Sequence, residues 1–251
     1  MPKASRGGQG ANRSGVGSIG QSHTGVVINT PGTSIPSPVQ AVKNYTQFTD
    51  TDATKMIAAN VDAYDDPDFN YARKLYVSDA TDASGFSFSQ NLNYKLDNGI
   101  ALNANEQFMA DMLQNGVRPI GKDTMLFRAA HDDILKRLGV SDYTKMTQAQ
   151  LQQKLVGTTM QTTSYASWSY DKSKNPFLPG QPNGGGREVY MVAKAGASTK
   201  MFFGAKSQAE VVTNIGTNMK ISNVYFDGTY ATPRIKGKSV PRIVIEVESW
   251  G

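Results

Sequence analysis

The chain has 251 residues, a formal net charge of +5, 39% hydrophobic residues and no cysteine. This length and hydrophobic content suffice for one full domain with an accessory segment, and the lack of cysteine excludes disulfides, thiolate metal sites and cysteine nucleophiles. No run approaches the roughly 20 apolar residues of a membrane helix, and Met1–Gly8 lacks the apolar stretch of a secretory signal peptide. We therefore expect a soluble protein.

Residues 1–45 have the composition of a segment that does not fold. They are rich in Gly, Ser, Pro, Thr and Asn, contain no Asp or Glu, and carry the basic residues Lys3, Arg6, Arg13 and Lys43. Such a segment cannot bury enough apolar surface to offset the entropy of ordering it. We expect a flexible basic arm, whose sparse charge fits a linker better than a tail for nucleic acid, a membrane or a partner.

Residues 46–118 show helical periodicity. Asp50–Asp52 can cap a first helix that carries Met56 and Val61 on its apolar side. Three further helices are predicted over Tyr71–Val77, Ser87–Leu96 and Asn105–Leu113. The purpose of this helical accessory segment stays open, because it could recognise a target or only support the rest of the chain.

Residues 119–251 change to a strand pattern, in short runs of apolar residues bounded by turn formers. The predicted strands are Leu126–Ala129, Thr158–Ser164, Val189–Val192, Val211–Thr213, Met219–Phe226 and Ile243–Val247.

The first of these strands ends in an arginine. Arg128 closes the apolar run within Asp123–Ala130. A guanidinium suits phosphate binding because its planar fork donates in pairs to oxygen atoms and keeps its charge at every relevant pH. The alternative is an arginine that extends from a strand end to solvent.

Two later segments add hydroxyl and carboxylate groups. Thr162, Thr163 and Ser164 form a run of three hydroxyl side chains, although such a run is also ordinary strand composition. Gln208-Ala209-Glu210 leads directly into a strand, a Gly-Thr turn and a second strand. If Glu210 begins that strand, the period of two places Gln208 and Glu210 on the same side.

In this order, the three segments resemble the motifs of mono-ADP-ribosyltransferases of the Arg, Ser-Thr-Ser, Gln-x-Glu class, which include clostridial-type bacterial toxins and related phage enzymes. The resemblance covers Asp123–Trp250. It implies an α+β fold, in which a split β-sandwich core of residues 119–251 follows the helical segment and the arm. It also implies NAD as a co-substrate and no metal.

The resemblance implies a role for each residue. Arg128 would bind NAD phosphate, the run Thr162–Ser164 would line the NAD site, Thr162 would orient the glutamate, and Glu210 would stabilise the positive charge that develops on the ribose. Two positions depart from the pattern: Ala129 stands where glycine is usual, and Thr162 replaces the first serine.

The resemblance also suggests how the ligands are recognised. A loop in the region of Asn175–Arg187 closes over NAD in this family, which makes Phe177 a candidate contact. In this family, a glutamine at the position of Gln208 accompanies modification of asparagine, glutamine or guanine, whereas a glutamate there accompanies modification of arginine. Phe202 and Phe203 are similar in placement to the aromatic residue that recognises the acceptor, which we expect to be a protein side chain or, less favoured, a nucleic-acid base.

Two other acidic groups need an interpretation. Glu246-Val247-Glu248 has a similar spacing, but the chain printed here ends three residues later, so we expect it to be the exposed face of the last strand. His131-Asp132-Asp133 could bind a divalent ion, but two aspartates at a helix start are more typical of capping, and we assign no metal.

Three functions stay open at this stage. The resemblance favours transfer of ADP-ribose from NAD to a macromolecule in the cytoplasm of a host or target cell. The net positive charge and the basic arm leave open a structural or nucleic-acid-associated protein, such as a phage virion component, that has the fold without the activity. An NAD glycohydrolase is the third.

Overall fold

The computed structural model describes residues 26–29, 47–83, 85–130, 132–175, 188–231 and 239–251. Most of the predicted arm, and Phe177, lie outside the described residues. Within the arm, Val26–Asn29 form strand β1, which pairs antiparallel with β4, Thr159–Thr162. This short part of the arm is therefore an edge strand rather than irregular chain.

Between β1 and β2, the described residues form five α-helices: α1 (Asp50–Ala59), α2 (Val61–Tyr64), α3 (Pro67–Tyr76), α4 (Phe88–Asp97) and α5 (Ala104–Gly116). Capping explains where three of them start. Thr49, Ser87 and Asn103 each accept a hydrogen bond from the backbone three residues on, and the side chain there bonds back. The first helix begins at Asp50, because Thr49 is the cap rather than one of Asp50–Asp52, and Asp52 closes the capping box.

The described strands form one hydrogen-bonded sheet, and two short helices lie within this part of the sequence. Besides β1 and β4, the strands are β2 (Arg118–Pro119), β3 (Thr124–Ala130), β5 (Ala166–Ser169), β6 (Val189–Ala195), β7 (Lys200–Phe203), β8 (Glu210–Thr213), β9 (Asn218–Ala231) and β10 (Ser239–Trp250), and the short helices are α6 (Asp133–Arg137) and α7 (Gln148–Leu155). Among the described residues the order is β1-β4-β9-β10-β6-β3-β5-β8-β7-β2, and only the β10–β6 pair is parallel.

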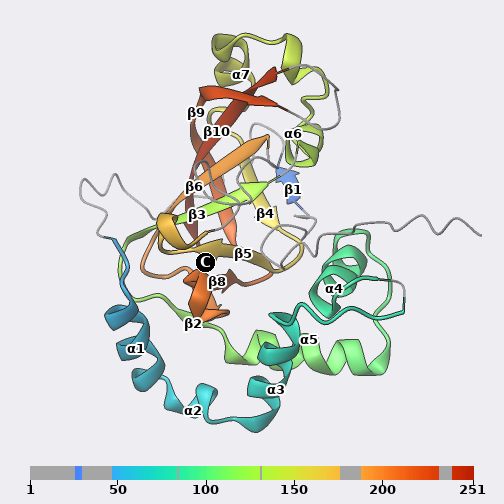
Figure 1. Cartoon of the computed structure of the whole chain (residues 1–251), viewed down its shortest axis with the longest axis vertical. Coiled ribbons are helices and arrows are strands. Elements are labelled where there is room, and N and C mark those ends of the chain that lie inside the picture. The colour runs from blue at the N-terminus through green and yellow to red at the C-terminus, as the bar shows by residue number, and fades with distance from the viewer. Residues whose placement is uncertain (1–25, 30–46, 84, 131, 176–187, 232–238) are drawn as a thin grey trace, which may run out of the picture.

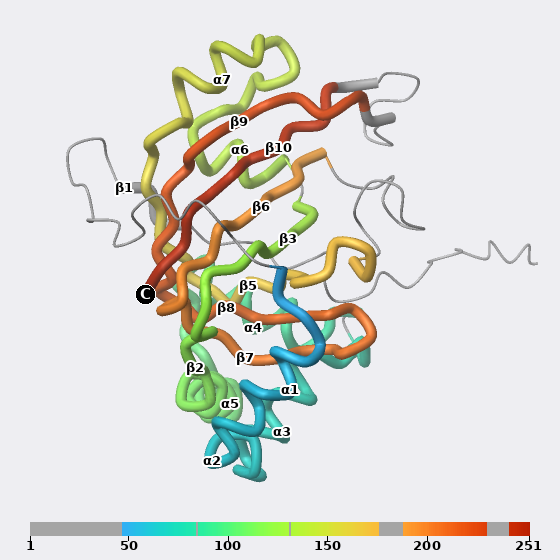
Figure 2. The backbone as a smooth tube through the Cα atoms, turned by 90° about the vertical axis from the view of Figure 1, so that its left-hand side faces the viewer, coloured from blue at the N-terminus to red at the C-terminus, as the bar shows by residue number. Residues whose placement is uncertain are grey.

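The sheet is divided into two halves between β3 and β5. These two strands meet through the single residue pair Phe127–Ser169, whereas β3 and β6 pair over seven residues. Figure 2 shows the consequence: β9, β10, β6 and β3 run together, and β5, β8 and β7 lie as a second group next to the helices. This is a split sheet, as the resemblance predicted.

The helical segment shares its core with the sheet. Phe69 on α3, Leu92 on α4 and Leu113 on α5 belong to the same buried cluster as Leu126 on β3 and Val211 on β8. Helices α1–α5 gather at the end of the molecule that holds β2 and β8, and α6 and α7 lie at the other end (Figure 1). Within the described residues, no helix has both the length and the hydropathy that crossing a bilayer requires.

Candidate active site

Three polar residues meet where the two halves of the sheet join. Arg128 lies on β3, Ser167 on β5 and Glu210 at the first position of β8, and these strands are neighbours in the sheet. Ser169 is the cross-strand partner of Glu210. All four side chains are buried. The order of strands therefore brings together residues that are far apart in the sequence.

Glu210 is a carboxylic acid in a nearly closed environment, with 2% of its surface exposed. Burial raises its pKa above the ordinary value. Three groups act against burial: the backbone amide of Ala205, which donates to Oε2 at 2.8 Å, the side chain of Ser167, which hydrogen-bonds to the carboxylate, and the charge of Arg128. The carboxylate is thus fixed in orientation from two sides.

The loop before Glu210 is shaped around this carboxylate. A side chain at Gly204 would overlap the carboxylate, so only glycine fits there in this conformation. Lys206–Gln208 form a turn of 3₁₀ helix, and Ala209 follows in the left-handed region at φ 47° and ψ 43°. This corrects the period-two expectation: Glu210 does begin a strand, but Gln208 lies in a turn, and the left-handed residue between them reorients the chain.

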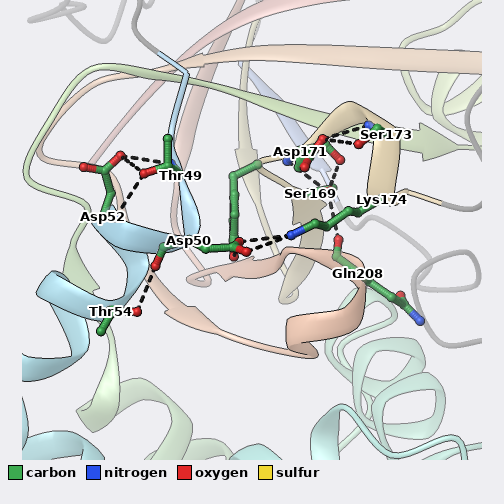
Figure 3. A network of polar contacts seen from close by, with 10 residues as sticks. Thr49, Asp50, Asp52, Thr54, Ser169, Asp171, Ser173, Lys174 and Gln208 are labelled. Carbon is green, nitrogen blue, oxygen red and sulfur yellow. Dashed lines mark hydrogen bonds and ion pairs between the residues drawn. The ribbon is translucent and has the colours of Figure 1, made fainter.

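Gln208 is held by its backbone and not by its side chain. The Ser169 hydroxyl lies 2.9 Å from the Gln208 carbonyl and 2.7 Å from the Asp171 carbonyl, to which it can donate. Figure 3 shows the Gln208 amide extending away from this network. Its Oε1 atom is buried and has no hydrogen-bond partner within the described part of the chain.

The same network ties the start of α1 to the end of β5. The Asp50 carboxylate accepts from the Tyr170 hydroxyl at 2.8 Å and from the Lys174 ammonium at 2.9 Å (Figure 3). Lys174 follows β5 in a turn of 3₁₀ helix, Lys172–Lys174. The first helix is therefore linked to the strand that carries Ser167.

Arg128 is buried against the same strand. Its Nη1 atom donates to the carbonyl of Ser167 at 2.8 Å, and its guanidinium carbon lies 6.0 Å from the centre of the Trp168 ring. Burial lowers the pKa of Arg128, and Tyr76, Asp133, Asp97 and Glu210 act in the opposite direction. The guanidinium stays protonated, because its ordinary pKa lies far above neutrality.

The hydroxyl run predicted to meet Glu210 has other partners. Thr162 donates to the carbonyl of Asn214 at 2.9 Å and accepts from the amide of Thr217 at 3.0 Å, so it holds the turn between β8 and β9. Thr163 donates to Asp97 at 3.1 Å. Ser164, in the link that joins β4 to β5, is buried. Both hydrogen bonds of the Thr162 hydroxyl thus go to the turn, which corrects the expectation that it meets Glu210, and the hydroxyl that hydrogen-bonds to Glu210 is that of Ser167.

Ser167 was missed because the sequence pattern predicted one strand over residues 158–164, whereas β4 ends at Thr162 and a second strand starts at Ala166. A signal was present. Ser167-Trp168-Ser169 has the same serine spacing as the family motif, and period two puts both serines on one face of a strand.

Phe202 and Phe203 lie in the core rather than at an entrance. The Phe202 ring packs against Phe69, Tyr76 and Tyr165, with ring centres 5.8 to 6.3 Å apart. Phe203 is also buried. A buried ring cannot contact a macromolecular acceptor, and this corrects the assignment of both residues to acceptor recognition. The exposed residues of the loop are Lys206 and Ser207.

The other acidic groups do not join the site. Glu246 and Glu248 lie on β10 on either side of the buried Val247, and both are half-buried rather than exposed as predicted. Asp132 is the residue before α6, and its side chain makes no capping hydrogen bond. His131 lies outside the described residues. Within the described ranges, no group of His, Cys, Asp and Glu has the arrangement of a metal site.

The fold of the chain resembles that of several solved structures. The chain is similar to solved structures of Plx2a, an ADP-ribosyltransferase toxin from Paenibacillus larvae (13% identity, TM-score 0.56, 80% of this chain and 96% of that one), and of an ADP-ribosyltransferase from Clostridium botulinum (18%, 0.55, 83% and 100%). A third is C3stau2 from S. aureus with NAD (15%, 0.55, 82% and 99%). No protein-family model and no curated protein sequence matches the chain.

The chain therefore has the ADP-ribosyltransferase fold. More particularly, its fold is that of the clostridial-type mono-ADP-ribosyltransferases, which confirms the predicted α+β architecture with a split sheet.

Proposed function

We propose that this protein is an NAD-dependent mono-ADP-ribosyltransferase. The observation that carries the proposal is the meeting of Arg128, Ser167 and Glu210 on three neighbouring strands of this fold, with Glu210 held by a hydroxyl and a backbone amide. One similar structure, C3stau2, was solved with NAD, which supports NAD as the co-substrate.

The chemistry follows from the bond that is broken. Cleaving the bond between nicotinamide and ribose leaves positive charge on the ribose, so a fixed carboxylate near that carbon stabilises the transition state more than the substrate. Glu210 supplies this charge. Ser167 orients Glu210, and Arg128 binds the phosphates of NAD through its paired donors. No group on the protein needs to change its charge for this step.

We also propose that the acceptor carries an amide or a similar pair of donor and acceptor atoms, as in an asparagine or glutamine side chain or a guanine base. Support comes from Gln208, a partly exposed residue in the loop before Glu210, whose Oε1 atom has no hydrogen-bond partner in the described part of the chain and becomes accessible when the side chain turns outward. An acceptor N–H would satisfy it, and the Gln208 amide could donate in return. A protein side chain is the favoured acceptor, and arginine is less suited because it has no acceptor atom.

Labelled NAD tests the proposal. The protein is incubated with NAD carrying the label on the adenylate part, with and without a cell lysate. We expect label to enter macromolecules with the native protein and not with Glu210→Gln, which keeps the shape of the side chain and removes its charge. Sensitivity of the label to protease or nuclease identifies the acceptor class. Free ADP-ribose without labelled macromolecules would instead indicate an NAD glycohydrolase.

A second candidate is a binding or structural protein that has the fold without turnover. The observation in its favour is that Glu210 and Arg128 each expose only 2% of their surface, whereas a ligand must reach both. Nucleic-acid binding that weakens with salt, together with no nicotinamide release, would support it.

A further inference from the structure

A buried polar cluster connects two helices to the strand that carries Ser167. Asn93 on α4 is fully buried, and its amide holds both backbone groups of Tyr165: Oδ1 accepts from the Tyr165 amide at 3.2 Å, and Nδ2 donates to the Tyr165 carbonyl at 3.1 Å. Tyr165 is two residues before Ser167. The amide of Asn93 therefore fixes the backbone at the entrance to β5.

The same amide also holds the hydroxyl of Tyr76 on α3. Asn93 Nδ2 donates to the Tyr76 oxygen at 2.9 Å. The Tyr76 hydroxyl, which is 1% exposed, can donate its own proton to the Tyr165 carbonyl at the long distance of 3.5 Å, and the side chain of Ser167 is its other hydrogen-bonding neighbour. The hydroxyl of Ser167 in turn bonds to Glu210.

We propose that Tyr76 is a positioning residue of the NAD-cleaving site: its hydroxyl, held by Asn93, orients the Ser167 hydroxyl toward Glu210. The inference rests on the proposed function of Ser167 and Glu210. In such a chain each donor polarises the next, so the bond to the carboxylate strengthens when the bond before it is formed. The helical segment thereby contributes directly to the site and is not only a support.

The ring of Tyr76 and its hydroxyl can be tested separately. The ring packs edge-on against Tyr165 and Phe202, with centres 5.5 and 5.8 Å apart. Tyr76→Phe keeps this packing and removes only the hydroxyl. A matched control is Tyr64→Phe, because the Tyr64 hydroxyl is also buried and accepts from the Phe203 amide at 3.1 Å, but has no bond to Ser167.

The first test is the titration of Glu210, followed by ¹³C NMR of the labelled carboxyl group and assigned with Glu210→Gln. Apart from burial and the hydrogen bonds of Ser167 and Ala205, two charged groups act on the pKa of Glu210. They are Arg128 and Asp79, and neither is altered in Tyr76→Phe. A hydrogen bond to the charged form lowers a carboxyl pKa, so weakening it in Tyr76→Phe should raise the pKa of Glu210. Tyr64→Phe should leave it unchanged. An unchanged or lowered pKa in Tyr76→Phe would overturn the proposal.

The second test is a double-mutant cycle on nicotinamide release. Tyr76→Phe should lower kcat about tenfold with little change in KM, as expected for weakening a charge-assisted hydrogen bond by about 1.4 kcal/mol. In a Ser167→Ala background it should have no further effect, because its action passes through Ser167. Independent effects in the two backgrounds would contradict the proposal. If the native protein releases no nicotinamide, the proposed function fails, and the titration still decides whether Tyr76 positions Glu210.

Discussion

Two triplets with the same spacing, Gln208-Ala209-Glu210 and Glu246-Val247-Glu248, are treated differently by the fold. The second lies within β10, where the pairing with β9 shifts register between Glu246 and Val247, and its carboxylates are half-buried. The first is a turn, a left-handed residue and the start of a strand, and Glu210 is enclosed by the loop that precedes it. The spacing is shared, but only the first triplet has a backbone that takes a carboxylate out of water.

The difference teaches that the local backbone, rather than the triplet, makes the site. A half-exposed carboxylate keeps most of its water and is free to pair with solvent ions. A buried one has few partners, and each partner fixes its position and changes its pKa. For Glu210 these partners are the Ala205 amide, Ser167 and Arg128. Four changes can break or sharpen this comparison.

The largest effect is expected from neutralising Glu210, compared with neutralising Glu246 in the second triplet. Glu210→Gln should lower the rate of nicotinamide release by about 10³-fold, the scale of losing one preorganised electrostatic contact in a transition state. Glu246→Gln should leave the rate unchanged, because its carboxylate is on β10, away from β8 in the sheet. Equal losses in both variants would show that the comparison is wrong.

The next effect concerns the space around the carboxylate. Gly204→Ala places a methyl group where the Glu210 carboxylate lies, and the carboxylate must move. A displacement of about 1 Å can cost about 100-fold in rate. Steady-state kinetics and circular dichroism on the same sample would separate a lost site from a lost fold. Full activity in a folded Gly204→Ala protein would mean that the enclosure of Glu210 is not required.

A smaller effect should distinguish the two hydroxyls. Ser167→Ala should lower kcat by about tenfold, which corresponds to one hydrogen bond to a charged group. Thr162→Val should instead lower the free energy of unfolding by about 1 kcal/mol, because it removes both hydrogen bonds that Thr162 makes in this turn. The Asn214 carbonyl keeps the Thr217 hydroxyl as a donor at 2.8 Å, and the Thr217 amide keeps only a longer bond of 3.4 Å to the same carbonyl. Urea unfolding and kinetics of both variants test this. A kinetic defect in Thr162→Val alone would restore the original sequence prediction.

The smallest effect should appear in the turn before Glu210. Ala209 is left-handed, a conformation that costs a residue with a side chain roughly 1–2 kcal/mol. Ala209→Gly should therefore raise the free energy of unfolding by up to about 1 kcal/mol, after the greater entropy of glycine in the unfolded chain is subtracted. Ala205→Gly, at an extended position with φ −72°, should lower it. The same sign for both variants in thermal unfolding would contradict the role of the turn.

The sequence predicted most of the elements, because their signals are local. Capping residues and apolar periodicity indicated α1, α3, α4 and α5, and the Gly-Thr turn indicated where β8 ends and β9 begins. The strand β5 was missed, since its four residues follow β4 after only three others and look like its continuation.

The candidate site was predicted in part for the same reason. Arg128 and Glu210 stand at strand positions that a local pattern can mark, and both lie in the site. Which hydroxyl meets Glu210 depends on the pairing of β5 with β8, and the burial of Phe202 depends on α3. These are contacts between distant segments, and no local pattern carries them. The left-handed Ala209 was hidden as well, because alanine is not a typical residue for that conformation.

The most direct test of the account is the release of nicotinamide from NAD by the purified native protein, measured beside Glu210→Gln after both are shown to be folded. The account predicts a steady release by the native protein that falls to near the uncatalysed rate in the variant. Equal rates in the two folded proteins, whether both high or both negligible, would contradict the claim that the buried Glu210 is the centre of an NAD-cleaving site.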